Sequence, residues 1–179
     1  MSLIQSQPLE LPEQTAAVHM ALYSSVINAS DLFQRLVARD TSLQMALLNA
    51  ETIMDPFQIM VAAHRAARAE QLGQLRTHNV HSELVFDLSP NNNIREALTR
   101  FGISSGSTHV LAVRVGGSQE QFAQEIAEIV EGRQEPIEQL SKYTNMETVR
   151  KYYKVPANLK SPEDVQHSVI GSMALKGHS

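Results

Sequence analysis

The sequence predicts a single α+β domain: a small, mostly antiparallel sheet of three to four strands surrounded by about seven helices. Three observations predict this class. Several segments begin with a residue that caps helices and continue with apolar residues three or four positions apart. Segments 15–23, 82–88 and 108–115 have the apolar patterns of strands. The 179 residues are 42% hydrophobic and 19% charged, which suits one globular core of ordinary size.

The N-terminal residues are expected to precede the domain. Pro8 and Pro12 interrupt any regular pattern, so residues 1–14 are predicted to be a flexible lead-in and residues 15–176 the domain. The first residues have neither a basic segment nor an apolar core, so no signal peptide is expected. Residues 15–23 alternate between apolar and other side chains, which predicts a strand.

Two helices are predicted after this strand. Ser30 is expected to cap a short helix that carries Leu32 and other apolar residues. Thr41 and Gln44 have the spacing of a capping box, which predicts a second helix with Leu47 facing inward.

The next segment is predicted to form the central helix of the fold. Asp55 followed by Pro56 predicts its start, because a carboxylate caps free N–H groups and proline suits the first helical position. Its alanines leave little side chain on one face, so another element can approach closely. Three- and four-residue spacings bring a histidine and two arginines together on the opposite side. The alanines are Ala62, Ala63, Ala66, Ala67 and Ala69, and the polar residues are His64, Arg65 and Arg68.

A strand, a polar turn and a helix are predicted to follow. Residues 82–88 alternate in a strand-like way. Asn93 and Glu96 have the spacing of a capping box after a run of three asparagines. Gly102 is predicted to end this helix in the left-handed conformation.

The C-terminal half is predicted to add one strand and three helices. The nearly continuous apolar run 108–115 is typical of an interior strand. Ser118 begins a helix, residues 131–140 are ambiguous by pattern, and residues 145–153 form a short helix. Ser161 caps the last helix, whose predicted inward stripe is Val165, Val169 and Met173.

Two motifs give the chain a family resemblance. The first is D-P-F-Q-I at 55–59 with A-A-x-x-A downstream, and the second is S-P-N-N-N-I-x-x-A-L-x-x-F-G-I-S at 89–104. Together they closely resemble the TPRKB kinase-binding proteins, subunits of the KEOPS complex. The resemblance covers nearly the whole chain and is weakest before Thr15 and around 154–164.

The resemblance implies a protein that is not an enzyme and needs no cofactor. It implies direct binding to the atypical kinase/ATPase of KEOPS, and contact with the other subunits through that kinase. It further implies binding of tRNA, notably its single-stranded 3′ end, during threonylcarbamoylation of adenosine beside the anticodon. Location in cytoplasm and nucleus is expected, with no membrane association and no direct contact with DNA.

Candidate residues for tRNA lie in a locally basic part of an acidic protein whose formal net charge is −4. Phosphate contacts need cationic forks, and exposed amides can bind base edges or a partner backbone. The candidates are Arg65, Arg68, Arg76 and Arg95 for phosphate, and Asn91 and Asn92 for base edges or sugar hydroxyls. The last helix has apolar residues on more than one face, so Ile170, Met173 and Ala174 are the candidates for the kinase interface.

One departure from the family pattern bears on RNA binding. The family has Thr-Arg-Thr-Leu before the predicted strand, and here His78 and Asn79 occupy the positions of its arginine and second threonine. An unperturbed imidazole is mostly uncharged at neutral pH, so His78 is expected to contact phosphate more weakly than arginine.

Other chemistry has little support in the sequence. No cysteine is present, no carboxylate stands at recognisable ligand spacing, and no P-loop or nucleophile motif occurs, so neither a metal site nor catalysis is expected. Two alternatives stay open. One is a small-molecule enzyme that uses His64, His78 or His81, and the other is a regulatory kinase-binding protein without RNA contact.

Overall fold

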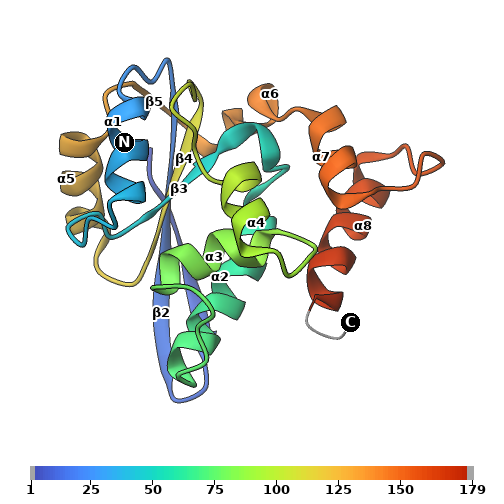
Figure 1. Ribbon diagram of the computed structural model, residues 1–179, viewed down its shortest axis with the longest axis horizontal. Helices are drawn as coiled ribbons and strands as arrows, with labels where there is room; N and C mark the ends of the chain where they lie inside the picture. Colours follow the sequence, from blue (N-terminus) through green and yellow to red (C-terminus); the bar gives the residue numbers. More distant parts are fainter. Residues whose placement is uncertain (1–2, 177–179) are drawn as a thin grey trace.

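The computed structural model describes residues 3–176 as a sheet with helices on both faces (Figure 1). The strand order is β1-β2-β4-β3, β5 pairs with β2 beside this path, and every pairing is antiparallel. The strands are β1 Gln5–Leu11, β2 Gln14–Ser24, β3 Ala46–Asn49, β4 Val110–Val115 and β5 Arg133–Glu135. The predicted α+β class is confirmed, with five strands in place of three to four.

Alternate residues of each central strand supply two apolar layers. Leu111 and Val113 of β4 pack with one group of helices, whereas Val110 and Ala112 pack with the other. The first group is α2 Pro56–Gln71, α3 Val80–Leu88, α4 Ile94–Phe101, α7 Met146–Tyr153 and α8 Pro162–Leu175. The second group is α1 Ala29–Val37 and α5 Gln119–Ile129. The remaining helical elements of the described residues are the short α6 Leu140–Tyr143 and the 3₁₀ turns η1 Ala50–Thr52 and η2 Ile137–Gln139. None of the helices in this range is long and apolar enough to cross a membrane.

The predicted flexible lead-in at 1–14 is wrong from Gln5 onward, because β1 forms a hairpin with β2 there. Gln5 pairs with Met20 and Leu11 pairs with Gln14. Leu9 and Leu11 are buried. The prediction took Pro8 as evidence against a strand because proline has no backbone N–H to donate. Strand β1 lies at the edge of the sheet, where a missing N–H is tolerated.

The prediction of a strand at 82–88 is also wrong, since these residues belong to helix α3. The Asn79 side chain accepts hydrogen bonds from the backbone N–H groups of His81 and Ser82 and so caps this helix. All residues from Glu83 to Leu88 are buried. A short helix buried on all sides shows no amphipathic period, so its apolar residues can alternate by coincidence.

Three smaller predictions about helix positions and ends are also wrong. The helix predicted at Thr41 is absent, and Leu47 lies in strand β3. Helix α1 is preceded by Asn28 at the capping position and not by Ser30. Gly102 follows α4 with φ −78°, outside the left-handed region.

The predicted starts of five helices are confirmed by side-chain caps. In each case the side chain accepts a hydrogen bond from a backbone N–H two or three residues later. The capping residues are Asp55, Asn93, Ser118, Asn145 and Ser161. Residues 131–140 form β5 and η2.

Candidate functional site

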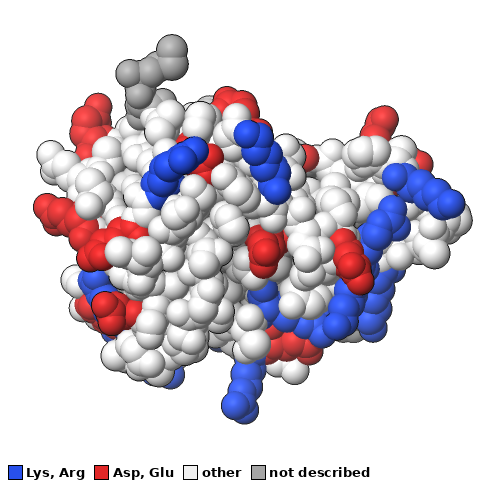
Figure 2. All heavy atoms as spheres, turned by 90° about the horizontal axis from the view of Figure 1, so that it is seen from above, with Lys and Arg blue, Asp and Glu red and all other residues white. Residues whose placement is uncertain are grey.

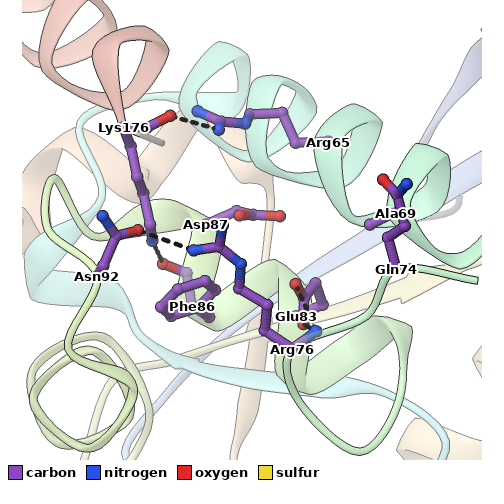
Figure 3. Close-up of a pocket in the computed structure, with 9 residues that line it drawn as sticks. All are labelled: Arg65, Ala69, Gln74, Arg76, Glu83, Phe86, Asp87, Asn92 and Lys176. Carbon is purple, nitrogen blue, oxygen red and sulfur yellow. Dashed lines mark hydrogen bonds between the residues drawn. The ribbon is translucent and has the colours of Figure 1, made fainter. Parts of the chain in front are cut away.

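A cavity of about 370 Å³ lies where α2, α3, the turn before α4 and the end of α8 meet. Figure 3 shows the side chains of Arg76 and Lys176 beside Asp87 in this cavity, and the Arg65 guanidinium directed toward the backbone of Lys176. Three cations and two carboxyl groups line it. The full lining is Arg65, Ala69, Gln74, Arg76, Glu83, Phe86, Asp87, Asn92 and Lys176.

Arg65 joins helix α2 to the end of helix α8. Its guanidinium donates hydrogen bonds to the backbone carbonyls of Met173 and, at 2.9 Å, of Lys176. The last carbonyls of a helix have no partner within the helix, and a cation there also offsets the negative end of the helix dipole. Arg65 therefore holds the C-terminal turn of α8 beside the cavity.

Lys176 is enclosed in the cavity wall. It is 3% exposed, and its ammonium donates to the carbonyl of Phe86 and lies 3.5 Å from the centre of the Phe86 ring. Burial lowers the pKa of Lys176 to about 8, with the charge of Asp87 acting in the opposite direction.

The two carboxyl groups differ in what they contact. Glu83 accepts hydrogen bonds from the backbone N–H groups of Arg76 and Thr77 and from the Thr77 hydroxyl, so it fixes the connection between α2 and α3. Asp87 is 6% exposed and lies beside Arg76 and Lys176 in the cavity lining. Burial raises the pKa of Asp87 to about 6, against the nearby charge of Lys176.

The outer rim of the cavity is polar and accessible. Arg76 and Asn92 are exposed, and the Arg76 guanidinium donates to the Asn92 side-chain oxygen at 3.1 Å. Among the described residues, the hydrogen bond to Asn92 engages one guanidinium N–H of Arg76 and leaves the Asn92 amide N–H groups to a ligand.

Of the six residues predicted to contact tRNA, the structure brings three into the cavity: Arg65, Arg76 and Asn92. Arg68 does not line the cavity, and its guanidinium donates a hydrogen bond to the Gln71 side-chain oxygen at 2.8 Å. Asn91 shapes the turn, since it accepts from the Asn93 N–H at 2.9 Å. Arg95 is exposed on α4 and is not among the lining residues.

Sequence reasoning missed Glu83, Asp87 and Lys176. The first two alternate with the apolar residues of a predicted strand, and polar positions of that kind are expected to face away from the core. In helix α3 both are buried and line the cavity. Lys176 follows the last helix and carried no pattern of its own.

The three residues predicted to form the kinase interface differ in how far they are buried. Met173 is 0% exposed and belongs to the core, so it offers no surface to a partner. Ile170 is half-buried and Ala174 is exposed on α8. Leu175, which was not predicted, is 70% exposed beside them.

The histidines do not form a common site. His64 and His78 are exposed, whereas the Nε2 atom of His81 accepts a hydrogen bond from the Val115 N–H at 3.1 Å. Burial lowers the pKa of His81 to about 4 and keeps the ring neutral. Within the described range, no three His, Cys, Asp or Glu side chains are placed to hold a metal ion.

Charge is distributed unevenly over the surface. Figure 2 shows Lys and Arg side chains gathered toward the end of the molecule that α7 and α8 form, and acidic side chains more frequent at the opposite end. Exposed cations at the basic end include Lys151, Lys154 and Lys160.

Comparison with known proteins assigns the chain to a family. The family model "Kinase binding protein CGI-121" matches residues 23–177, most of the chain. The chain belongs to the CGI-121 family.

Curated relatives agree over nearly the full length. The EKC/KEOPS complex subunit CGI121 of Yarrowia lipolytica is 34% identical over 175 residues, covering 96% of this chain and 100% of the relative. The EKC/KEOPS complex subunit TPRKB of Danio rerio is 34% identical, covering 96% and 97%. The subunit cgi121 of Aspergillus terreus is 34% identical, covering 96% of each.

In this member of the CGI-121 family, the buried Tyr153 binds the first motif and the residue just before the second. Gln58 of the first motif donates from Nε2 to the Tyr153 hydroxyl at 2.8 Å and accepts from the Met54 N–H at 2.9 Å. The Tyr153 hydroxyl donates at 2.5 Å to the carbonyl of Leu88, just before the second motif. The Tyr153 hydroxyl therefore joins the start of α2 to the end of α3, and both helices line the cavity.

Proposed function

We propose that this CGI-121 family member is a non-catalytic KEOPS subunit that binds the atypical kinase of the complex directly, and the other subunits through it. We further propose that it helps bind tRNA, through the single-stranded 3′ end, for threonylcarbamoyladenosine formation. Family membership and the names of the relatives support the complex. The observation that carries the RNA part is the cavity, in which cations from three separate segments converge.

Kinase docking is proposed on the exposed side of α8. Ile170, Ala174 and Leu175 offer apolar surface there, while Val165 and Val169 hold the other side of the helix in the core. A charge at the centre of such an interface is expected to weaken binding by more than about 2 kcal/mol.

Kinase binding is tested by isothermal titration with Ala174→Arg and Ile170→Arg. Ala174 is already exposed, so its variant should fold normally, and circular dichroism checks both. The matched control is Val37→Arg, at a 63% exposed apolar position on α1 in the opposite layer. Kinase affinity equal to wild type in both α8 variants would place the interface elsewhere.

RNA binding is proposed to use Arg76 and Asn92 at the open rim, since these side chains are exposed. Each cation that neutralises a phosphate on single-stranded RNA contributes about −0.7 to the slope of log K against log salt. Arg76→Ala should therefore flatten the slope by about 0.7. Arg65→Ala is less informative, because Arg65 also holds the end of α8.

The matched control for Arg76 is Arg133→Ala on β5, whose side chain is 78% exposed. Its slope should equal that of wild type. A tRNA trimmed at the 3′ end should bind more weakly than the intact molecule. Equal affinity for both tRNAs would contradict the proposed contact with the tail.

A regulatory kinase-binding protein without RNA contact is the second candidate. The observation that favours it is the pair of carboxyl groups, Glu83 and Asp87, which offset much of the positive charge in the cavity. Absence of tRNA binding by the protein, alone and with the kinase, would favour this second candidate.

A further inference from the structure

Strands β1 and β2 place an exposed serine against a buried histidine. Ser6 of β1 and His19 of β2 are directly opposite each other in the antiparallel register, so their side chains project from the same face of the sheet. The Ser6 hydroxyl oxygen lies 2.7 Å from Nδ1 of His19. Ser6 is exposed, whereas His19 is only 3% exposed. A hydroxyl group that solutes can reach is therefore hydrogen-bonded to an imidazole that is enclosed by the protein.

The contacts of the His19 ring determine which of its nitrogens carries the hydrogen. Nε2 lies 2.9 Å from the backbone carbonyl oxygen of Gly117, and a carbonyl oxygen can only accept. In the neutral ring Nε2 is therefore the donor, and Nδ1 has the free lone pair. The ring also stacks on Phe122, with the two ring centroids 5.9 Å apart and the planes at 27°. These contacts hold the Nδ1 lone pair toward the Ser6 hydroxyl group.

One other acceptor lies within reach of the Ser6 hydroxyl hydrogen. The side-chain oxygen of Gln119 is 3.1 Å from the hydroxyl oxygen. The imidazole nitrogen is nearer, at 2.7 Å, and it is a stronger base than an amide oxygen, so it accepts the single hydroxyl hydrogen. Ser6, His19 and the Gly117 carbonyl thus have the arrangement of nucleophile, base and orienting group that activates serine hydroxyls.

We propose that Ser6 is an acyl-accepting site, at which His19 acts as general base toward a small activated acyl donor such as a mixed anhydride, a thioester or a phenyl ester. The hydroxyl oxygen forms a bond to the acyl carbon while its proton passes to Nδ1 of His19. The bond from that carbon to the leaving group breaks, and the leaving group departs with the electron pair. The product is an ester on Ser6, and the proton on Nδ1 passes on to the leaving group or to water.

The position of Ser6 determines the class of donor. Ser6 is exposed on the edge strand β1, so the donor approaches the hydroxyl group from solvent. An exposed site supplies little binding energy to stabilise the transition state, and reactions with poor leaving groups need such energy most. Amides and alkyl esters are therefore not expected to react, whereas activated donors need only the nucleophile and its base. The inference is independent of the surfaces proposed for the kinase and tRNA, because β1 contributes to neither.

The test exposes the full chain briefly to p-nitrophenyl acetate and locates the acetyl groups by peptide mass spectrometry. Neutral hydroxylamine removes acetyl groups from serine and not from lysine, which separates the expected ester from amide formed at lysines. Ser105 is the control within the same molecule, since it is exposed and, among the described residues, its hydroxyl group contacts no imidazole. A positioned general base typically contributes about 10²- to 10⁴-fold. Ser6 should therefore be acetylated at least about a hundredfold faster than Ser105.

The role of His19 is tested with His19→Gln. Glutamine keeps a hydrogen-bond acceptor and a donor in the side chain but cannot take up the proton. Acetylation of Ser6 should fall to the rate of Ser105, although a hydrogen bond to Ser6 is retained, which a merely structural role of His19 would not produce. His64→Gln, at an exposed position on α2, is the matched control and should leave the rate at Ser6 unchanged. Thermal unfolding confirms that both variants fold.

The outcomes decide the inference with or without the variants. Acetylation of Ser6 no faster than that of Ser105 in the wild-type protein overturns it, and this comparison holds even if His19→Gln does not fold. Rapid ester formation at Ser6 in a folded His19→Gln protein overturns the role of His19 as base. Rapid ester formation in wild type and in His64→Gln, lost in His19→Gln, supports both parts of the inference.

Discussion

Replacing Gly102 by alanine should destabilise the fold although the backbone there is ordinary. A Cβ atom at this position would lie 2.7 Å from the Leu98 carbonyl oxygen, closer than real contacts of this kind. The chain cannot easily move away, since Gly102 bridges to Leu48 in β3 and the next N–H, that of Ile103, donates to the Leu47 carbonyl at 3.2 Å. Overpacking against fixed backbone costs about 1–3 kcal/mol.

Two other glycines separate this effect from backbone conformation. Gly73 has φ +67° and open space around its Cβ position, so Gly73→Ala should lose about 1–2 kcal/mol from the left-handed conformation alone. Gly106 has neither a positive φ nor an atom within 4 Å. Gly106→Ala should be neutral, or stabilising by up to about 1 kcal/mol, because alanine has fewer unfolded conformations.

Urea denaturation followed by circular dichroism measures all three free energies of unfolding. The expected order of stability is Gly106→Ala above wild type or equal to it, with Gly73→Ala and Gly102→Ala below. A Gly102→Ala protein within about 0.5 kcal/mol of wild type would refute the close approach to Leu98. Loss of stability in Gly106→Ala as well would mean that alanine acts through a cause other than the two assigned here.

Three further predictions concern single side chains. Tyr153→Phe should lower stability by about 1–3 kcal/mol in urea denaturation, because it leaves the buried Leu88 carbonyl without the hydroxyl donor, whereas Tyr152→Phe, at a half-buried position, should be neutral. The pKa of His81 is lowered to about 4 by burial, from about 6.5 when unfolded, so its contribution is fully present above about pH 6.5 and is lost as pH falls toward 4. Wild type should therefore lose about 2–3 kcal/mol relative to His81→Gln across that range, and parallel stability curves would contradict the assignment. His78→Arg should strengthen tRNA binding and steepen the salt slope by about 0.7, since it places a fixed charge at an exposed position, and an unchanged slope would exclude a phosphate contact there.

Local capping signals predicted helix starts well because they depend on a few neighbouring atoms. Asp55, Asn93 and Ser161 cap their helices as the sequence indicated. Each of these caps needs only the side-chain oxygen and a backbone N–H two or three residues away.

Patterns of apolar residues failed where burial was complete or where pairing was distant. Residues 83–88 are all buried, so neither the strand period of two residues nor the helix period of 3.6 residues was informative. Strand β3 at Ala46–Asn49 is defined by its pairing with β4, more than sixty residues later in the chain, and that pairing overrode the local capping signal at Thr41. Strand β1 depends in the same way on its register with β2.

The candidate site was only partly predictable because it is assembled from segments distant in sequence. Arg76 and Asn92 were identified by charge and exposure, which are local properties. Asp87 and Lys176 meet across 89 residues and are recognised only by their burial in one cavity. Burial of ionisable groups is the feature that composition cannot report.

Helix α8 connects the two proposed surfaces. Ile170 and Ala174 lie on its outer side, while its C-terminal carbonyls are held by Arg65 and its following residue, Lys176, forms part of the cavity wall. A partner that shifts α8 by even a small amount therefore changes the positions of two of the three cations in the cavity. Because linkage between binding sites is reciprocal, a ligand that fixes Lys176 and Arg65 must change the affinity of such a partner by the same factor. The contacts of Arg65 thus do more than stabilise a helix end: they make the geometry of the cavity depend on the position of the helix proposed to bind the kinase.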